Sequence, residues 1–338
     1  MTIGWGLIGI GTHANRFLGP AIVQSFDTSF VAVCGRSPER ARDFAARHGV
    51  KRWYDSYEKM LEDPEVDVVL VATPNNLHAQ NTVQAAKARK HVLCEKPMAL
   101  TEEDCMQMIK ACKENGVKLG VDYQNRYHPA HIEARRLIQD GTVGEIKVVC
   151  ARYCSGFMRG RWKGGWRDDP EITGAGALMA TAVHPVDLLR FVMDTEIDEV
   201  QAACVTQTPF HSVDEMVYSI LKFKNGAYGT VVSGILAPRS DNDMIIYGSQ
   251  AKITCKGTIA MPLQGELFVE GDSINIRMNF PVPDPVPASY IRLIEGFNRY
   301  IRDKAAFESS ATNGLQMTRI TSAILESSRL QKVVKVEN

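Results

Sequence analysis

Apolar residues in the first third of the chain gather in short runs, separated by stretches with helical periodicity. Short apolar runs predict buried strands, and the amphipathic stretches between them predict helices. Strands that are hydrophobic along nearly their whole length are typical of a parallel sheet with helices on both faces. Residues 1–122 are therefore expected to form an α/β domain. The expected strands cover residues 3–9, 30–34, 66–71, 91–94 and 117–121, and the expected helices cover residues 38–48, 77–89 and 101–115.

The pattern changes after residue 122, where strands begin to follow one another without long helices between them. Such a succession predicts a mostly antiparallel sheet, so residues 123–338 are expected to form a second, α+β domain. A proline-rich stretch at 281–287 is expected to end the sheet. The expected strands cover residues 146–153, 199–206, 217–223, 228–235, 244–247, 252–254 and 266–269, and the expected helices cover residues 129–139, 178–192, 290–304 and 314–334.

Length and charge limit the class of protein. The 338 residues are enough for two domains, and the 39 basic residues are balanced by 39 acidic ones. A neutral chain offers no general attraction to nucleic acid or to an anionic membrane, so neither is expected as a partner. No run approaches the roughly 18 apolar residues of a membrane span, and the N-terminal run lacks the features of a signal peptide. The eight cysteines show neither Cys-x-x-Cys pairs nor metal spacing, which indicates a cytoplasmic protein without a metal site.

A glycine-rich turn follows the first expected strand and has the pattern G-x-G-x-x-A. In a dinucleotide-binding fold the first glycine permits the tight turn and the second lets the backbone approach a pyrophosphate. The small third position lets the helix pack on the strand, and the N–H groups of that helix bind the anion. The predicted cofactor-binding residues of this turn are Gly9, Gly11, Thr12, His13 and Ala14.

The end of the second strand predicts which dinucleotide is bound. NAD-binding folds place an acidic residue there for the ribose 2′-hydroxyl, whereas this strand ends at Cys34. Arg36, Ser37 and Arg40 follow it, and their side chains would suit the 2′-phosphate of NADP(H). The alternative is that both arginines are only solvated residues at the start of a helix. The sequence favours NADP(H) over NAD(H).

Two polar segments, at 71–78 and 94–97, begin where expected strands end. Ligands of open α/β sheets bind outside the carboxyl ends of the strands, so both segments are expected at one site. Pro97 restricts Lys96 to an extended conformation at the strand tip, where a lysine would neutralise a substrate oxygen or relay a proton. The predicted cofactor-binding residues here are Thr73, Pro74, Asn75, Asn76, His78, Glu95 and Lys96.

The loop at 157–167 interleaves two tryptophans with basic residues. Such a loop would suit stacked nucleic-acid bases or a sugar ring, and the neutral charge of the chain favours the sugar. Tyr123 and Arg126, just past the strand at 117–121, are expected to line the same cleft. The predicted substrate-binding residues are Tyr123, Arg126, Trp162, Trp166, Arg167 and His184.

Four motifs together resemble those of the Gfo/Idh/MocA family, over essentially the whole chain. They are G-x-G-x-x-A at 9–14, A-T-P-N-x-x-H at 72–78, E-K-P at 95–97 and G-x-G-A-L…H-x-x-D at 174–187. The segments at 5–9, 91–97 and 165–167 are most similar to the NADP-dependent 1,5-anhydrofructose reductases of that family. The resemblance implies a Rossmann domain, a C-terminal domain with an open sheet that joins subunits, and hydride transfer at a sugar or polyol carbon. A homodimer or homotetramer is therefore expected.

The same resemblance implies roles for individual residues. Lys96 matches the catalytic lysine of the family, and His184 matches a histidine that acts as acid and base near the nicotinamide. The family most often has an aspartate four residues before this histidine, where this chain has Ala180. Asp187 would share a helical face with His184 and is predicted to take over the role of the missing carboxylate. The alternative is a sensor or regulator that kept the fold and lost the chemistry.

Overall fold

The computed structural model describes residues 2–156, 162–259, 265–280 and 288–337. Part of the tryptophan-containing loop and the whole proline-rich stretch at 281–287 lie outside these ranges. Internal contacts divide the chain into two units. The first contains the residues up to Gln124, and also α9 (Ala288–Asp303) and the chain from there to Thr318. The second runs from Asn125 through the sheet strands and resumes at Arg319.

The first unit is built on six parallel strands in the order β3-β2-β1-β4-β5-β6. This is the strand order of the doubly wound dinucleotide-binding fold, and it confirms the predicted class. The edge strand β3 was not predicted, because its three residues are only partly buried and form no apolar run. The strands are β1 (Ile3–Ile8), β2 (Thr28–Cys34), β3 (Arg52–Tyr54), β4 (Val68–Val71), β5 (His91–Glu95) and β6 (Leu119–Asp122).

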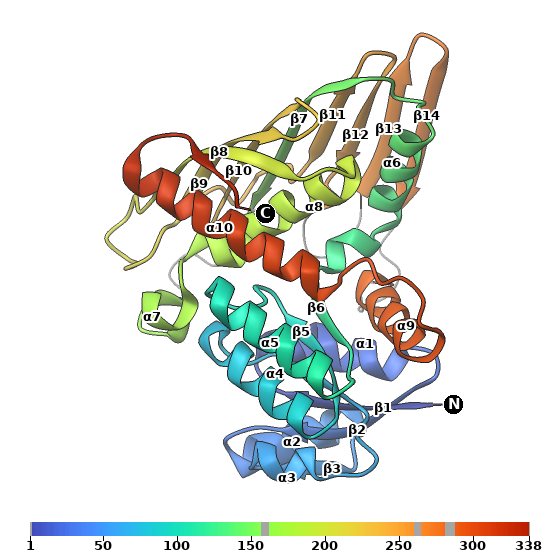
Figure 1. Cartoon of the computed structure of the whole chain (residues 1–338), viewed down its shortest axis with the longest axis vertical. Coiled ribbons are helices and arrows are strands. Elements are labelled where there is room, and N and C mark those ends of the chain that lie inside the picture. The colour runs from blue at the N-terminus through green and yellow to red at the C-terminus, as the bar shows by residue number, and fades with distance from the viewer. Residues whose placement is uncertain (1, 157–161, 260–264, 281–287, 338) are drawn as a thin grey trace. The chain divides into compact units, whose positions relative to one another are not determined.

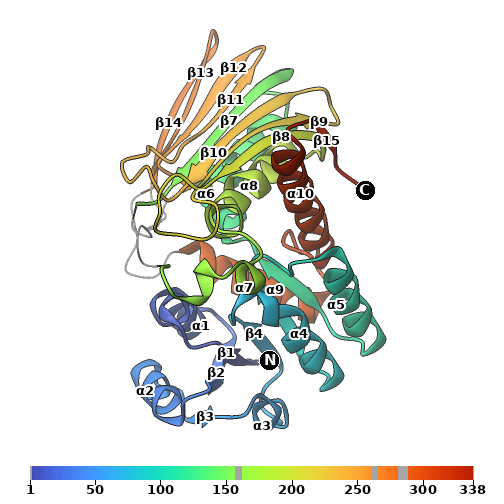
Figure 2. The same cartoon turned by 90° about the vertical axis from the view of Figure 1, so that its left-hand side faces the viewer.

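Helices cover this sheet as the alternating pattern predicts. α4 and α5 lie side by side in both views (Figures 1 and 2). The predicted helix at 38–48 is found with those bounds, because the Ser37 side chain caps its first turn and Gly49 ends it in the left-handed conformation. The helices are α1 (Gly19–Gln24) after a π-helical turn at Ala14–Leu18, α2 (Pro38–His48), α3 (Tyr57–Leu61), α4 (His78–Lys87) and α5 (Glu102–Glu114).

The C-terminal helix α9 belongs to the first unit, which differs from the predicted boundaries of 1–122 and 123–338. Trp5 on β1 donates a hydrogen bond from Nε1 to Oδ1 of Asn298, at 3.1 Å. The Asn298 amide nitrogen in turn donates to Thr28 Oγ1 at 2.8 Å, and Phe297 packs edge-on against Trp5. An amphipathic pattern shows that a helix has a buried face, but it does not show which sheet that face covers.

The second unit contains a nine-stranded sheet in the order β14-β13-β12-β11-β7-β10-β9-β8-β15. Among the described strands only β7 and β10 pair in parallel, so the predicted mostly antiparallel sheet is confirmed. The edge strands β14 and β15 were missed, and β15 replaces the predicted last turn of the helix at 314–334, which ends at Leu330. The strands are β7 (Ile146–Cys154), β8 (Ile197–Val205), β9 (Met216–Phe223), β10 (Tyr228–Gly234), β11 (Met244–Gly248), β12 (Ala251–Lys256), β13 (Gly265–Gly271), β14 (Ile274–Phe280) and β15 (Val334–Lys335).

One face of this sheet is covered by α6 (Pro129–Gln139) and α8 (Val183–Met193), which pack against each other (Figures 1 and 2). The last part of α10 (Ala311–Leu330) joins them, because Ser327 and Ser328 accept hydrogen bonds from backbone N–H groups of β8. The prediction that no stretch approaches a membrane span in length and hydropathy needs a correction here. The helical stretch Pro170–Met193 does so, but 83% of its most apolar window is buried inside the protein, as in a core helix of a globular fold.

The opposite face of the sheet exposes large apolar side chains at its centre. The apolar residues of β9 and β10 alternate between the two faces, so Ile220 points outward whereas Val217 and Val231 are buried. Alternation along each strand and the pairing register place the exposed side chains on one face. They are Val148 on β7, Tyr218 and Ile220 on β9, Tyr228 on β10 and Tyr247 on β11, each 41–52% exposed.

Candidate active site

The three small residues of the glycine turn serve three different purposes. Gly9 has a φ of +97°, and a Cβ there would lie 2.3 Å from the carbonyl oxygen of Ala72. A Cβ at Gly11 would meet nothing within 4 Å, so the backbone at this position faces open space. Ala14 is buried at the start of the following helical turn. The turn therefore has the shape that a pyrophosphate requires, with its backbone accessible at Gly11.

His13 connects this turn to two other parts of the first unit. Its Nε2 lies 3.0 Å from Oε1 of Glu95, at the end of β5, and 3.3 Å from the hydroxyl of Tyr290 on α9. The rings of His13 and Tyr290 also pack edge to face. Sequence reasoning missed Tyr290, because an aromatic residue in an amphipathic helix carries no signal of a site.

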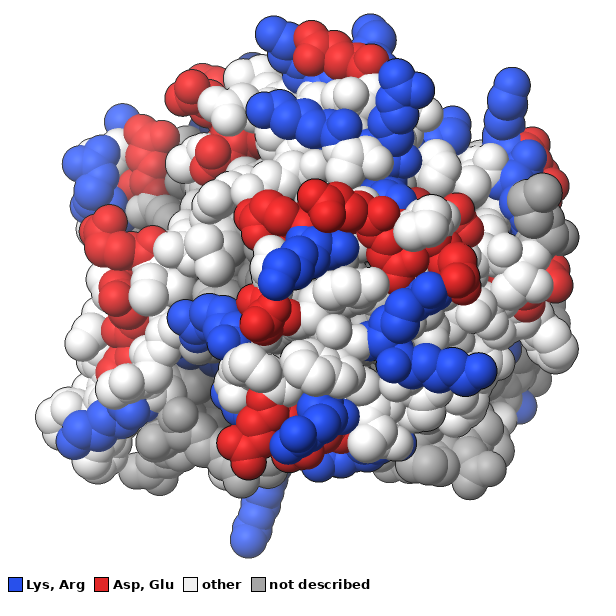
Figure 3. All heavy atoms as spheres, turned by 90° about the horizontal axis from the view of Figure 1, so that it is seen from below, with Lys and Arg blue, Asp and Glu red and all other residues white. Residues whose placement is uncertain are grey.

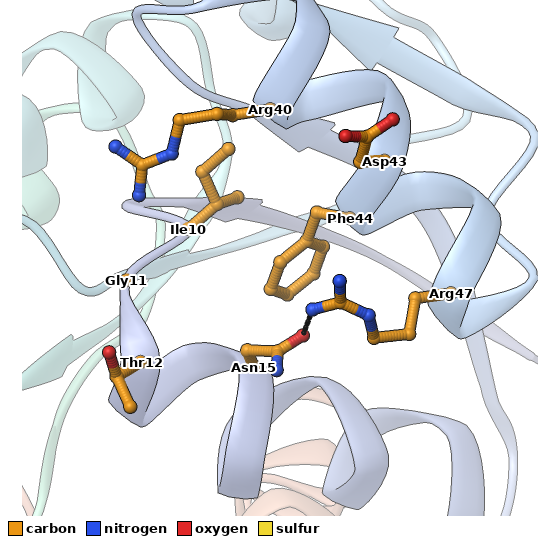
Figure 4. Close-up of a pocket in the computed structure, with 8 residues that line it drawn as sticks. All are labelled: Ile10, Gly11, Thr12, Asn15, Arg40, Asp43, Phe44 and Arg47. Carbon is orange, nitrogen blue, oxygen red and sulfur yellow. Dashed lines mark hydrogen bonds between the residues drawn. The ribbon is translucent and has the colours of Figure 1, made fainter.

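A pocket of about 250 Å³ opens beside the glycine turn. Figure 4 shows Arg40 and Arg47 of α2 on two sides of it, with the Phe44 ring between them. Arg47 donates a hydrogen bond to Asn15 Oδ1 at 2.7 Å. The pocket is lined by Ile10, Gly11, Thr12, Asn15, Arg40, Asp43, Phe44 and Arg47.

Arg36 and Ser37, the other two residues of the predicted 2′-phosphate site, differ in what their side chains do. Arg36 is exposed just past the end of β2. The hydroxyl of Ser37 caps α2 by accepting a hydrogen bond from the backbone N–H of Arg40, at 3.3 Å. The structure therefore leaves the guanidinium groups as the accessible charges, and it uses Ser37 to start the helix that carries Arg40.

The surface around this end of the protein is mixed in charge. On the face that Figure 3 shows, the described lysines and arginines are interspersed with aspartates and glutamates. Among the described residues of the whole chain, Arg52 in the first unit and Arg136 in the second each pair with two carboxylates. This face therefore carries no continuous positive patch, as the balanced composition predicts.

His78 holds the two polar segments at the strand ends together. It is 1% exposed, and its Nδ1 and Nε2 lie 2.8 Å from the Pro97 carbonyl and 2.9 Å from the Thr73 carbonyl. Burial lowers the pKa of His78, although both carbonyls act in the opposite direction. Asn81 donates to the Thr73 hydroxyl from the same helix. His78 thus connects the two segments that are predicted to bind the cofactor. In the first of these segments, Asn75 is buried and Asn76 is exposed.

Lys96 follows β5 directly and is partly exposed, whereas Glu95 before it is buried. One carboxylate oxygen of Glu95, Oε2, accepts a hydrogen bond from the backbone N–H of Lys96 at 3.1 Å. Asp122, which the sequence analysis did not single out, is the neighbour of Glu95 across the β5–β6 pairing and is 1% exposed. A single acidic residue at the end of a strand gives no signal until the register shows what it faces.

In the second unit, His184 lies on the first turn of α8 and is 7% exposed, with its ring edge-on to Tyr153 at 5.6 Å between centroids. Ala180, on the preceding π-helical turn Leu178–Ala182, packs against an apolar cluster of Trp162, Val213 and Ile235. A carboxylate at position 180 would lie against these apolar side chains, which explains why alanine is suited to the position.

The start of the helical segment that carries His184 is fixed by Asp214. Its carboxylate accepts hydrogen bonds from the backbone N–H groups of Gly176, at 2.6 Å, and Leu178, at 2.8 Å. Burial raises the pKa of Asp214, and the two N–H groups act against that shift. This residue was not predicted, because its partners lie more than 30 residues away in the sequence.

Asp187 and Arg126, predicted for separate roles, pair with each other. Arg126 binds both carboxylate oxygens of Asp187, through Nε at 2.8 Å and Nη2 at 2.5 Å, and both side chains are at most 3% exposed. Arg190 lies 3.7 Å from the same carboxylate. The roles predicted for Asp187 beside His184 and for Arg126 at the substrate stay predictions, and the structure adds that these two side chains pair with each other.

The remaining predicted substrate residues differ in exposure. Trp162 is 3% exposed and packs edge-on against His211, so its ring is part of the core of the second unit. Tyr123 is 2% exposed in the first unit. Trp166 is partly exposed, with the guanidinium of Arg167 4.2 Å above its ring. Of these residues, Trp166 and Arg167 have the surface that a polar ring could contact.

Comparison with known protein families gives two matches, one in each of the two units of the chain. Residues 3–123 match the GFO/IDH/MocA oxidoreductase family, with its NAD-binding Rossmann fold. Residues 131–254 match the GFO/IDH/MocA C-terminal domain. Together these matches cover most of the chain and include both the glycine turn and the helix of His184.

The individual relatives include reductases and dehydrogenases. The chain is 30% identical to a 1,5-anhydro-D-fructose reductase of Ensifer adhaerens, over 80% of this chain and 81% of the relative. It is 31% identical to a trans-1,2-dihydrobenzene-1,2-diol dehydrogenase of Danio rerio, over 86% and 84%. Among solved structures, a levoglucosan dehydrogenase in complex with NADH and levoglucosan superposes with a TM-score of 0.89 at 26% identity and covers 100% of both chains.

Proposed function

Because the chain belongs to the Gfo/Idh/MocA family of oxidoreductases, we propose that it transfers a hydride between a nicotinamide dinucleotide and a ring carbon of a sugar or polyol. The observation that carries this proposal is the carboxyl edge of the first sheet, where the open glycine turn and Lys96 follow β1 and β5. The named relatives support the substrate class, since two act on anhydrosugars and one on a ring diol.

Two side chains carry the proposed chemistry, and the bound nicotinamide would supply or accept the hydride. His184 donates a proton to the substrate oxygen during reduction and takes it back during oxidation. The ammonium of Lys96 stabilises the negative charge that develops on that oxygen. The burial of His184 supports its role, because a proton donor shielded from water exchanges its proton with the substrate rather than with solvent.

The rival function is a cofactor-binding sensor or regulator, and its one supporting observation is the apolar setting of Ala180. Lys96 and His184 are both retained, which favours the enzyme. Oxidation of NADPH should be followed with a panel of ketoses and dicarbonyl sugars. We expect turnover with at least one of them, in the direction of reduction. Saturable sugar binding without any oxidation of NADPH would favour the sensor.

We expect NADPH to bind more tightly than NADH, because Arg36 and Arg40 follow β2 where NAD-binding folds have an acidic residue. A charge-assisted hydrogen bond contributes about 1.5–3 kcal/mol, so Arg36→Asp should weaken NADPH binding about ten- to a hundredfold and change NADH binding little. Fluorescence titration measures both affinities. Arg42→Asp, an exposed arginine of α2 outside the pocket, is the matched control. Equal affinity of the unaltered protein for both cofactors would contradict the preference.

We also propose a homodimer or homotetramer joined through the exposed face of the second sheet. Five large apolar side chains there form a surface that water would solvate poorly. Light scattering at micromolar concentration should report a dimer or larger species, and Ile220→Asp should shift it to a smaller one. Phe26→Asp, at an exposed apolar residue of the first unit, should leave the assembly unchanged. A monomeric parent protein would rule out this assembly.

We also propose that the protein is cytoplasmic. All eight cysteines are free thiols, and six of them are buried. Free buried thiols suit a reducing compartment such as the cytoplasm.

A further inference from the structure

Two buried carboxyl groups face each other beside Lys96. Glu95 ends β5 and Asp122 ends β6, and the parallel register pairs them directly. Glu95 is 9% exposed and Asp122 1%. Within the described parts of the chain, no side-chain donor bonds to either oxygen of Asp122; the side chain that it meets is the carboxyl of Glu95, and the backbone N–H of Gln124 lies beside it.

Two carboxyl groups in contact inside a protein do not both ionise, because burial and mutual repulsion oppose the second negative charge. Burial, followed by the charge of Glu95, raises the pKa of Asp122 well above the usual range. Burial alone would raise the pKa of Glu95 too, but His13 and Lys96 outweigh it and hold that pKa below its ordinary value. The pair therefore retains one proton, on Asp122, and one negative charge, on Glu95.

The charged and titratable groups around this pair come from several elements. His13 reaches Glu95 from the glycine turn, Lys96 lies next in sequence, and His78 acts on Glu95 from α4. The thiol of Cys94 adjoins on β5 and is kept protonated by burial, which raises its pKa. The backbone N–H of Gln124 lies beside Asp122 and acts against the rise in its pKa. The single negative charge on Glu95 therefore interacts electrostatically with His13, Lys96 and His78.

We propose that Asp122 is a positioning residue, whose neutral carboxyl donates a hydrogen bond to Glu95 and fixes that carboxylate where it holds His13 and the backbone of Lys96. The shared proton is a property of the folded chain alone, whereas the effect on turnover rests on the proposed function. Ionisation of Asp122 would replace this hydrogen bond by repulsion, and Glu95 would no longer be held where it contacts both His13 and the backbone of Lys96.

Asp122→Asn separates this role from a merely structural one, because a carboxamide donates a hydrogen bond as the neutral acid does but does not ionise. We expect its kcat/KM to equal that of the parent near pH 6.5. The parent should then lose kcat/KM as the pH rises through the ionisation of Asp122, and the variant should keep it. Asp122→Ala, which lacks the donor, should have a kcat/KM about tenfold below that of the parent at pH values where Asp122 of the parent is protonated, and this gap should close as Asp122 ionises. An alkaline decline that is the same in Asp122→Asn and the parent would overturn the positioning role.

Thermal unfolding without cofactor tests the shared proton independently of turnover. A carboxyl whose pKa is raised on folding stabilises the protein below its unfolded pKa of 3.8, and this contribution is lost as the pH rises through the folded pKa. The Tm of Asp122→Asn minus the Tm of the parent should therefore increase by several degrees between pH 5 and pH 9. Asp55→Asn, at an exposed carboxylate, should show no such trend. A Tm difference that is constant with pH would overturn the shared proton, whereas failure of the proposed function would leave the trend intact.

Discussion

Replacing His184 by alanine is expected to lower kcat about 10²–10⁴-fold, which is the usual cost of losing a general acid. The imidazole is buried and lies edge-on to Tyr153, so solvent would replace it poorly as a proton source. Steady-state kinetics with NADPH and a reducible sugar measure the loss. The affinity for NADPH should change little, because the glycine turn and the basic pocket that we assign to the dinucleotide belong to the first unit.

His131→Ala provides the control, because His131 is another buried histidine of the second unit with a structural role. Its ring bridges the Asn125 carbonyl and the Thr258 hydroxyl. This variant should lose stability while its folded fraction keeps the parent's kcat. Full turnover by His184→Ala would show that the proton comes from elsewhere, such as Lys96 or water, and our assignment of roles would be wrong.

The second large effect is expected on stability. Asp187→Asn should lower the free energy of unfolding by about 3–5 kcal/mol, because it leaves the Arg126 guanidinium buried without its counter-charge. The bidentate contact and the burial of both groups distinguish this pair from a surface ion pair, which contributes about 0–1 kcal/mol. Urea unfolding measures the difference. We expect kcat to fall as well, because Asp187 is predicted to take over the role of the carboxylate that is missing at position 180.

A double variant tests whether the effect comes from the unpaired charge. Asp187→Leu combined with Arg126→Met removes both charges and keeps apolar volume, so it should be far more stable than Asp187→Asn alone. If Asp187→Asn costs less than about 1 kcal/mol, the pair behaves as a surface ion pair and the buried arrangement does not hold in solution.

The sequence alone determined the features that depend on neighbours along the chain. The strands of the first sheet are continuous apolar runs because both of their faces are buried, so they were predicted within two residues, except for the short edge strand β3. The helix Pro38–His48 was predicted with its observed bounds, because the residues that begin and end it are local. The glycine turn was predicted for the same reason, since a φ of +97° at Gly9 permits few residues besides glycine.

The tertiary structure decided what each side chain of the site faces. Lys96 and Glu95 could be placed at the sheet edge from sequence, because parallel strands present their carboxyl ends together. Asp122 opposite Glu95 and Tyr290 beside His13 could not, since each depends on strand register or on helix packing between distant segments. The pairing of Asp187 with Arg126, and the burial of Trp162, are likewise contacts across long sequence separations. Local patterns specify which faces are buried, and only the packed fold specifies which partners they meet.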